Sequence, residues 1–385
     1  MEREQAVRLT QNLLKKMVEK EGSDLFITTG FPPAIKVDGT IHKTTDEPLS
    51  PDQSAMMVRS IMNDKQIREF DATKECNFAI TPQGIGRFRV SAFIQQGYVG
   101  AVLRTITTEI PTLDGLELPP ILKDVAMNKR GLCIVVGGTG SGKSTTLAAM
   151  IDHRNKNSKG HIVSIEDPVE YVHPQEGCVI TQREVGVDTD SWHAALKNTL
   201  RQAPDVILIG EIRDRETMEY GIQFAETGHL CLATLHANNA NKAIYRIINF
   251  FPEERRQQLL MDMSLNTKAF VSQRLIPRET GIGRVAAMEV MLNSPLIAEL
   301  IFKGEVGQIK EIMARSTRLG MQTFDQALFT LWEDGIISYE EAMRNADSMN
   351  ELRLRIKLES KRESSIADQQ SESLHIMEED KARTF

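Results

Sequence analysis

A glycine-rich stretch holds the residues whose types and spacing point most directly to chemistry. Residues 137–144 read GGTGSGKS, which matches G-x-x-x-x-G-K-[ST], between an apolar run and a helix-forming segment. The glycines allow backbone N–H groups to surround phosphates, and a helix start favours their negative charge. Lys143 is expected to reach the β- and γ-phosphates, and Ser144 to coordinate Mg²⁺. The predicted nucleotide-binding residues are Gly137, Gly138, Thr139, Gly140, Ser141, Gly142, Lys143, Ser144 and Thr145.

Two acidic stretches offer the carboxylates that hydrolysis needs. PDVILIGEIRD (204–214) is a buried strand ending near Glu211, which is expected to hold Mg²⁺ through water or to polarise the attacking water. SIEDPVEYVH (164–173) also begins at a strand end and brings Glu166, Asp167 and Glu170 together. These three carboxylates suit either a base for water or a solvated acidic loop.

TGHLCLATLHANNA (227–240) places His229 and His236 at the two ends of one predicted strand. No cysteine partner and no i, i+4 helical pair accompanies them, so the spacing disfavours a metal site. Each histidine can be a sensor of the γ-phosphate or a structural hydrogen-bonding residue.

Three arginines, Arg87, Arg89 and Arg104, fall in a β-rich region that precedes the glycine loop. Arginines on a sheet surface commonly lay their stems along it and keep the charge in water. The alternative is that one of them reaches a nucleotide bound by a neighbouring subunit.

Two regions of different pattern must position these residues. The first opens with an amphipathic helix, continues with strands that fold back at Asp38-Gly39, and has a helix from Pro51, capped by Ser50, through about Asp64. Strand-like segments then run from Cys76 to Ile106. This pattern predicts a small α+β domain with an antiparallel sheet, over residues 1–107.

A turn-rich linker is predicted over 108–120, and a second domain over 121–360. In that domain buried strands at 132–136, 161–165, 206–209 and 230–233 alternate with helical segments, and helices dominate from about Asn293. This alternation is typical of an α/β domain with a mainly parallel sheet. The polar, acid-rich segment 361–385 is expected to be a disordered tail.

Composition limits the classes of function. The net charge of −7 and pI of about 5.7 disfavour a general nucleic-acid binder. The four cysteines form no CxxC pair, which disfavours a zinc or redox motif and suggests a reducing compartment. No apolar run approaches the ~20 residues of a membrane helix, and the amino terminus lacks a signal-peptide core, so a cytoplasmic protein is expected.

The four motifs in this order resemble the secretion and type IV pilus ATPases. The resemblance extends from about Ser23 to Asn345 and includes SDLF, PPAIKVDG, GRFRVSAF, SQRLIPR and GMQTFDQAL. The long amino-terminal extension and four-cysteine metal subdomain usual in assembly-type members are absent, so the chain resembles the retraction branch, the PilT and PilU type. Phe26, the segment PLIAELI (295–301) and the long acidic tail favour the accessory PilU type.

This resemblance implies a PAS-like domain followed by a RecA-like P-loop ATPase domain, in a hexameric ring at the inner-membrane pilus machine. It implies ATP and Mg²⁺ as cofactors, an inner-membrane platform protein and a companion retraction ATPase as partners, and no nucleic acid. Lys143, Ser144 and Glu211 match the phosphate, Mg²⁺ and Walker B residues of the family, and Glu170 the candidate base. The remaining matches are His229 and His236 for the histidine box, and Arg87, Arg89 and Arg104 for basic residues that face nucleotide.

Other functions remain as alternatives. A RecA-type nucleic-acid translocase shares the ATPase core but fits the acidic charge poorly. A regulatory GTPase is disfavoured because no N/T-K-x-D motif is present. A structural protein that binds ATP with little turnover is disfavoured by the intact Lys143, Glu170 and Glu211.

Overall fold

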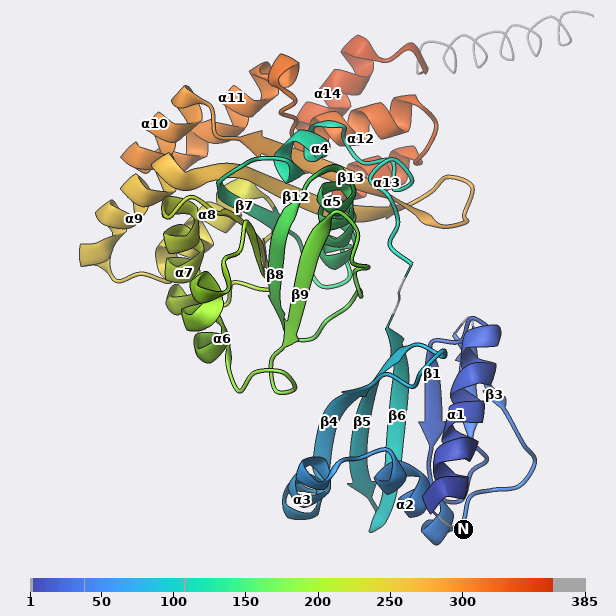
Figure 1. Cartoon of the computed structure of the whole chain (residues 1–385). Coiled ribbons are helices and arrows are strands. Elements are labelled where there is room, and N and C mark those ends of the chain that lie inside the picture. Colours follow the sequence, from blue (N-terminus) through green and yellow to red (C-terminus); the bar gives the residue numbers. More distant parts are fainter. Residues whose placement is uncertain (1–2, 38, 107–108, 363–385) are drawn as a thin grey trace, which may run out of the picture. The chain divides into compact units, whose positions relative to one another are not determined.

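The computed structural model describes residues 3–37, 39–106 and 109–362, which form two compact units (Figure 1). Within these ranges the first unit comprises Met1–Ile110 with the segments Asp167–Pro174 and Gln182–Ser191. The second comprises Pro111–Glu166, Gln175–Thr181 and Trp192–Phe385. No helix among the described residues is both long and apolar enough to cross a membrane.

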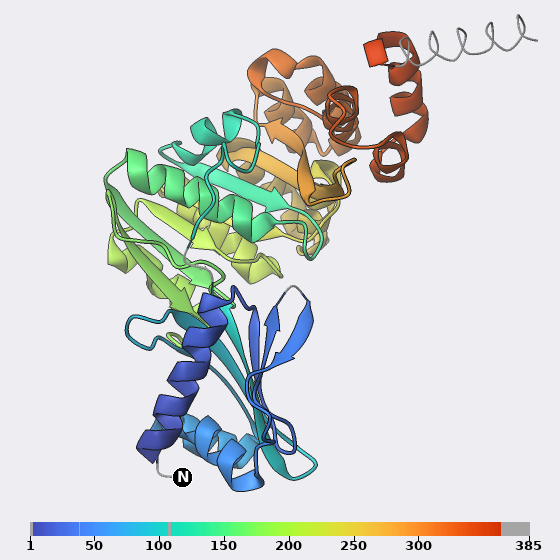
Figure 2. The same ribbon diagram turned by 90° about the vertical axis from the view of Figure 1, so that its right-hand side faces the viewer.

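The first unit is built on a six-stranded antiparallel sheet with the order β3-β2-β1-β6-β5-β4. Helices α1 and α2 pack against the sheet (Figure 2). Leu14, Met17 and Met57 of these helices are buried in the core. The predicted antiparallel α+β domain is therefore confirmed. Its elements are α1 (Arg3–Glu19), β1 (Asp24–Ile27), β2 (Ala34–Val37), β3 (Thr40–Lys43), α2 (Pro51–Ser60), α3 (Asp64–Thr73), β4 (Glu75–Ile80), β5 (Arg87–Gln95) and β6 (Tyr98–Ile106).

Local sequence signals explain two of these elements. Strands β2 and β3 pair as a hairpin in which Val37 faces Thr40, as predicted, although Asp38 lies outside the described residues. Helix α2 begins at Pro51 after the Ser50 cap, as predicted, but the helix expected through Asp64 ends at Ser60. Asn63 accepts a hydrogen bond from the Gln66 amide and caps a separate helix, α3, which the apolar pattern did not reveal.

The second unit contains a seven-stranded mixed sheet with the order β13-β12-β7-β11-β10-β8-β9. Neighbours from β12 to β8 run parallel, whereas β12 and β13 are antiparallel. The four predicted strands are confirmed as β7, β8, β10 and β11, but the sequence patterns did not reveal β9 or the long β12–β13 hairpin. The strands are β7 (Gly131–Val136), β8 (Gly160–Glu166), β9 (Cys178–Glu184), β10 (Val206–Ile209), β11 (Leu230–Leu235), β12 (Thr267–Pro277) and β13 (Arg284–Leu292).

Helices flank this sheet and dominate the end of the chain, as predicted. The carboxyl-terminal helices bury their own cluster around Phe324, Leu328 and Trp332, together with Ile276 and Val285 of the β12–β13 hairpin. The helices are α4 (Ile121–Ala126), α5 (Lys143–Asn157), α6 (Trp192–Thr199), α7 (Arg215–Glu226), α8 (Ala240–Asn249), α9 (Glu253–Asn266), α10 (Pro295–Lys303), α11 (Ile309–Arg315), α12 (Phe324–Glu333), α13 (Tyr339–Asn345) and α14 (Met349–Glu359).

Parts of the predicted linker and tail lie in the described ranges, and these parts contact the second unit. Leu113 and Leu118 of the segment 109–120 are buried in the core of the second unit, so this part of the linker packs onto that unit. In the tail, Arg362 donates to the Glu279 carboxylate at 3.0 Å, and residues 363–385 lie outside the described part of the chain.

All four cysteines are buried. Cys133 on β7 and Cys231 on β11 lie in the apolar interior of the second unit, as small hydrophobic residues would. Burial raises the pKa of the Cys133 thiol to about 12 and raises that of Cys231 further. Both thiols are therefore un-ionised at neutral pH.

Candidate active site

The glycine loop joins the carboxyl end of β7 to the start of α5. Gly140 and Gly142 have φ values of +74° and +87°, a left-handed conformation that favours glycine. In the described part of the chain, apart from the adjoining residues, no atom lies within 4 Å of the position that a Cβ would occupy on Gly138 or Gly140. The loop backbone is therefore open to a ligand there. On its inner side the loop is closely packed, because a Cβ on Gly137 would lie 2.8 Å from the Gln273 carbonyl oxygen. The loop is thus an open cradle of backbone amides on a tightly packed base.

Lys143, at the start of α5, folds back over this loop. Its Nζ donates to the carbonyl oxygens of Gly137 at 3.0 Å and Gly138 at 2.8 Å, and the residue is buried. Burial lowers the pKa of the ammonium, while the nearby charge of Glu211 opposes that shift. The cation is therefore held where phosphate oxygens would meet the loop.

Glu211 follows β10, and two basic side chains contact its carboxylate. Arg213 Nε donates to Oε2 at 2.8 Å, and His236 Nε2 lies 3.1 Å from Oε1. Gly210 permits this placement, because a Cβ there would lie 3.2 Å from Glu166 Cα at the end of β8. The Glu211 carboxylate is thus fixed at the strand edge where the phosphate loop also begins.

His236 and His229 occupy opposite ends of β11. This strand pairs in parallel with β7, so that Leu235 faces Val136 and His236 comes beside the start of the phosphate loop. His229 precedes the strand at its other end. At a rise of ~3.3 Å per residue, the length of the strand separates the two histidines by about 20 Å. His229 Nδ1 lies 3.2 Å from the Phe224 carbonyl oxygen. The structure therefore brings His236, but not His229, to the phosphate loop of the same unit.

Burial and the charge of Lys143 lower the pKa of His236, whereas Glu211 raises it. The lowering effects prevail, so the ring is mainly neutral at neutral pH. A neutral ring that donates from Nε2 can hydrogen-bond the Glu211 carboxylate without cancelling its charge.

The acidic stretch after β8 divides between the two units. Glu166 ends β8 in the second unit, beside β10, and accepts the Ser164 hydroxyl at 2.7 Å. Glu170 is exposed and belongs to the first unit. Of these two carboxylates, only Glu166 shares a unit with Lys143 and Glu211.

The three arginines share one face of the first unit's sheet. Arg89 faces Arg104 across β5 and β6, and Arg104 faces Asp24 across β6 and β1. Arg104 Nε donates to the buried Asp24 carboxylate at 2.7 Å, although the Arg104 side chain is 65% exposed. Arg104 therefore has a structural partner that the sequence did not reveal.

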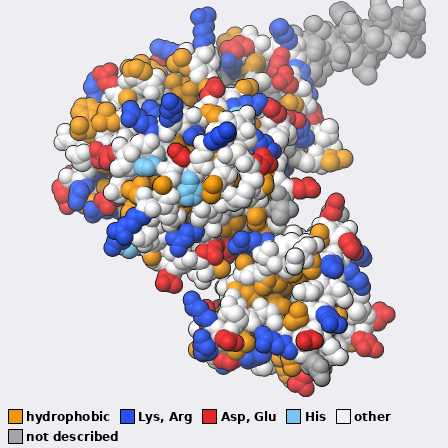
Figure 3. Space-filling model, in the orientation of Figure 1, with side chains coloured by type: hydrophobic (Ala, Val, Ile, Leu, Met, Phe, Trp, Pro, Cys, Tyr) orange, Lys and Arg blue, Asp and Glu red, His pale blue; other side chains and the backbone are white. Residues whose placement is uncertain are grey.

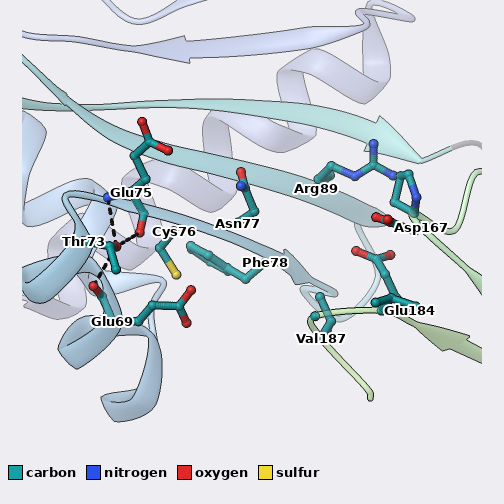
Figure 4. Close-up of a pocket in the computed structure, with 13 residues that line it drawn as sticks. Glu69, Thr73, Glu75, Cys76, Asn77, Phe78, Arg89, Asp167, Glu184 and Val187 are labelled. Atoms are coloured by element: carbon teal, nitrogen blue, oxygen red, sulfur yellow. Dashed lines mark hydrogen bonds between the residues drawn. The ribbon is translucent and has the colours of Figure 1, made fainter. Parts of the chain in front are cut away.

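Arg87 and Arg89 differ from Arg104. Among the described residues, neither has an acceptor for its buried Nε, and Arg89 Nη2 donates weakly to the Val169 carbonyl oxygen at 3.4 Å. Arg89 also lines a cavity of about 570 Å³ in the first unit, together with Asp167 and Glu184 (Figure 4). Its guanidinium thus has unused donors in an open, partly acidic setting.

Arg213 and Gln273 also belong to the site, although the sequence patterns do not identify either as a candidate. Gln273 lies on β12, is buried, and accepts the Thr146 hydroxyl of α5 at 2.6 Å through Oε1. Both residues lie in segments that resemble family motifs, GEIRD and SQRLIPR, but the sequence does not show what their side chains contact.

Together these groups suit phosphate-ester chemistry. Open backbone amides at a helix start and the buried Lys143 cation fit the oxygens of a di- or triphosphate. The exposed Ser144 hydroxyl and the Glu211 carboxylate provide the hard oxygen donors that Mg²⁺ prefers. The donor set therefore fits a magnesium–nucleotide complex.

Comparisons with known proteins agree with this chemistry. A family model described as "Type II/IV secretion system protein" matches residues 1–318. The chain is 60% identical to "Type IV pilus ATPase PilU" of Pseudomonas aeruginosa, over 97% of this chain and 98% of that protein. It is 42% identical to "Type IV pilus retractation ATPase PilT" of the same organism, over 87% of this chain and 97% of that protein.

Solved structures give the same result. The crystal structure titled "Pilus Retraction Motor PilT and Bound ADP" superposes with a TM-score of 0.83 at 39% identity, over 89% of this chain and 98% of that one. The ATPase DotB of Legionella pneumophila gives a TM-score of 0.76 at 25% identity, over 87% and 94%. The likeness thus covers both units of the fold.

Proposed function

The chain belongs to the type II/IV secretion ATPase family as a type IV pilus ATPase of the PilT and PilU type, and from this premise we propose how it works. We propose that it is a hexameric motor that assists pilus retraction. Its first unit would be a PAS-like domain and its second a RecA-like ATPase domain. The observation that carries this proposal is the meeting of Lys143, Glu211 and His236 beside one phosphate loop.

The residues of the second unit have separate roles in the proposed reaction. The loop amides and Lys143 bind and orient the β- and γ-phosphates. Ser144 and Glu211 would hold Mg²⁺, which when bound neutralises charge on the phosphate oxygens. His236 keeps the Glu211 carboxylate oriented. Removing any of these contacts is expected to reduce turnover more than it reduces folding stability.

Two further features of the proposal concern partners. A motor of this kind would act on an inner-membrane platform protein and beside a companion retraction ATPase, from the cytoplasmic side. The chain's net charge is −7, and acidic and basic side chains are interspersed over the face in Figure 3, which favours these protein partners over nucleic acid.

Pilus retraction in cells tests this function directly. The chain would be expressed in a strain that lacks its own copy, with and without the companion motor, and retraction force would be measured with an optical trap. We expect restored retraction when the companion is present and little when it is absent. Full retraction without the companion would overturn the accessory role, and no effect in either strain would overturn the pilus function.

Glu170→Gln is expected to retain ATP binding and to lower ATP turnover by about 10²-fold or more, because the amide cannot accept a proton. Turnover and nucleotide affinity would be measured on the purified full chain. Glu176→Gln, which changes an exposed glutamate that follows in the same stretch of sequence, is the matched control and should leave turnover unchanged. A wild-type rate for Glu170→Gln would transfer the proposed base to Glu211 or Glu166.

Arg104→Ala and Lys143→Ala are each expected to be nearly inactive, but to regain partial activity when mixed in one ring. A guanidinium from a neighbouring subunit would stabilise the departing phosphoryl charge, an effect on the order of 10³-fold in related enzymes. Asp24→Asn is the control, because it removes the ion-pair partner and leaves Arg104 in place. If verified mixed rings stay inactive, the arginine does not act in trans, and Arg89 or Arg87 becomes the next residue to test.

A further inference from the structure

The loop between β11 and α8 forms one wall of a cavity beside the phosphate loop. The cavity, about 500 Å³, lies in the second unit and is lined by Gly138, His236, Asn238 and residues of α8. Because His236 contacts Glu211 from this loop, the loop's position determines whether that contact is made.

Three contacts hold the loop from elements that follow it in the chain. Arg274 of β12 donates from Nη2 to the Asn238 carbonyl oxygen at 3.1 Å. Asn239 donates from Nδ2 to Asp347 Oδ2 at 3.0 Å. The Ala240 amide donates to Glu289 of β13 at 2.7 Å. The start of α8 is therefore bound at three successive residues.

Arg274 and Asp347 also bind each other and join the loop to the carboxyl-terminal helices. Arg274 Nη2 donates to Asp347 Oδ1 at 2.6 Å, and its guanidinium lies 4.0 Å from the ring centre of Phe324 on α12. Asp347, between α13 and α14, donates its own amide to Asp325 of α12 at 2.8 Å. A displacement of these helices would therefore be transmitted to residues 238–239.

Arg274, Asp347, Asp325 and Lys310 form a cluster in which each charge has a partner of opposite sign. Burial raises the pKa of the Asp347 carboxyl, but the hydrogen bond and charge of Arg274 outweigh burial and hold that pKa below its ordinary value. Lys310 Nζ of α11 lies 3.1 Å from Asp325 and 3.7 Å from Asp347. The Asp347 carboxyl is therefore ionised at neutral pH, and breaking one of its contacts leaves a largely buried charge with fewer partners.

We propose that Asn239, Arg274 and Asp347 are positioning residues for ATP hydrolysis, which connect the carboxyl-terminal helices to the His236–Glu211 contact. This inference rests on the proposed ATPase site and adds a route by which a partner bound to those helices would change turnover. The three contacts to residues 238–240 do not involve the phosphate loop. We therefore expect the loss of these contacts to lower turnover without changing nucleotide affinity.

A double-mutant cycle tests the proposal on the full chain. Asn239→Ser keeps an oxygen that can cap α8 but removes the donor to Asp347, and Asp347→Ala removes the acceptor. We expect each to lower kcat about tenfold with the Kd for ADP within twofold of wild type. The double variant should be no slower than the slower single variant, because both remove the same connection.

Arg278→Gln is the matched control, because Arg278 follows β12 and pairs with Glu117 at 2.7 Å, away from the loop. It should leave kcat unchanged. Wild-type kcat in Asn239→Ser, additive losses, or a parallel fall in ADP affinity would each overturn the positioning role. An inactive wild-type protein would instead overturn the proposed ATPase function.

Discussion

Lys143→Ala is expected to abolish ATP turnover, by at least about 10²-fold, and to leave both units folded. The ammonium is the buried cation of the phosphate loop, and among the described residues it donates hydrogen bonds to the carbonyl oxygens of Gly137 and Gly138. Without the lysine, charge that develops on a phosphoryl group at this loop loses a buried cation that would stabilise it. Steady-state turnover, with circular dichroism and thermal unfolding, measures both parts of the expectation.

Lys156→Ala supplies the control on the same helix. Lys156 lies in the last turn of α5, with 47% of its side chain exposed, and pairs with Asp152 at 2.8 Å. Among the residues that the structure describes, Lys156 pairs with Asp152 and not with the phosphate loop, so turnover should remain near wild type. A folded Lys143→Ala protein with normal turnover would contradict the assignment of the loop as the nucleotide site.

Glu289→Gln is expected to stabilise the protein increasingly as pH rises from 5 to 8. Burial raises the pKa of the Glu289 carboxyl from an ordinary 4.5 to about 7, despite hydrogen bonds from the Ala240 amide and the Ser272 hydroxyl. The folded protein thus keeps a proton that the unfolded chain releases above about 4.5. Stability associated with this proton is present at low pH and is lost as pH rises through 7.

The size of this effect follows from the pKa difference. It approaches a value on the order of 3 kcal/mol above pH 7, because each pKa unit corresponds to ~1.4 kcal/mol. Glutamine carries no charge and still offers an oxygen to both donors, so the variant should match wild type near pH 5 and exceed it at pH 8. Urea unfolding at both pH values measures the difference.

Glu299→Gln is the contrasting control. Glu299 is an exposed acid on α10, and its hydrogen bond with Lys303 lowers the pKa of its carboxyl. Removing that carboxylate should not stabilise the protein at pH 8. A Glu289→Gln protein less stable than wild type at pH 8 would show that the hydrogen bonds of the carboxylate outweigh the cost of burying its charge.

The phosphate loop, the family and the parallel strands around Glu211 could be predicted because each is encoded locally. Val206–Ile209 forms a continuous apolar run, and such a run is typical of a strand buried on both faces. The glycine spacing before Lys143 specifies a backbone shape within a few residues. These signals do not depend on distant parts of the chain.

The contacts of the site could not be predicted, because they join residues far apart in sequence. Arg104 pairs with Asp24 only because β6 lies beside β1, and the amphipathic pattern gives no strand order. The separation of His229 from the phosphate loop likewise follows from the parallel register of β11 and β7. Neither the Arg104–Asp24 pair nor the position of His229 can be predicted until the neighbours of each strand in the sheet are known.

The buried cysteines have a practical consequence for experiments on motion. Because all four thiols are shielded from water, alkylating reagents would react with them only when the surrounding structure opens. A single cysteine introduced on the surface should therefore be labelled selectively by a fluorophore or spin label, without removal of the native ones. The rate at which the native thiols react would, in the same sample, report how often the interior of each unit opens.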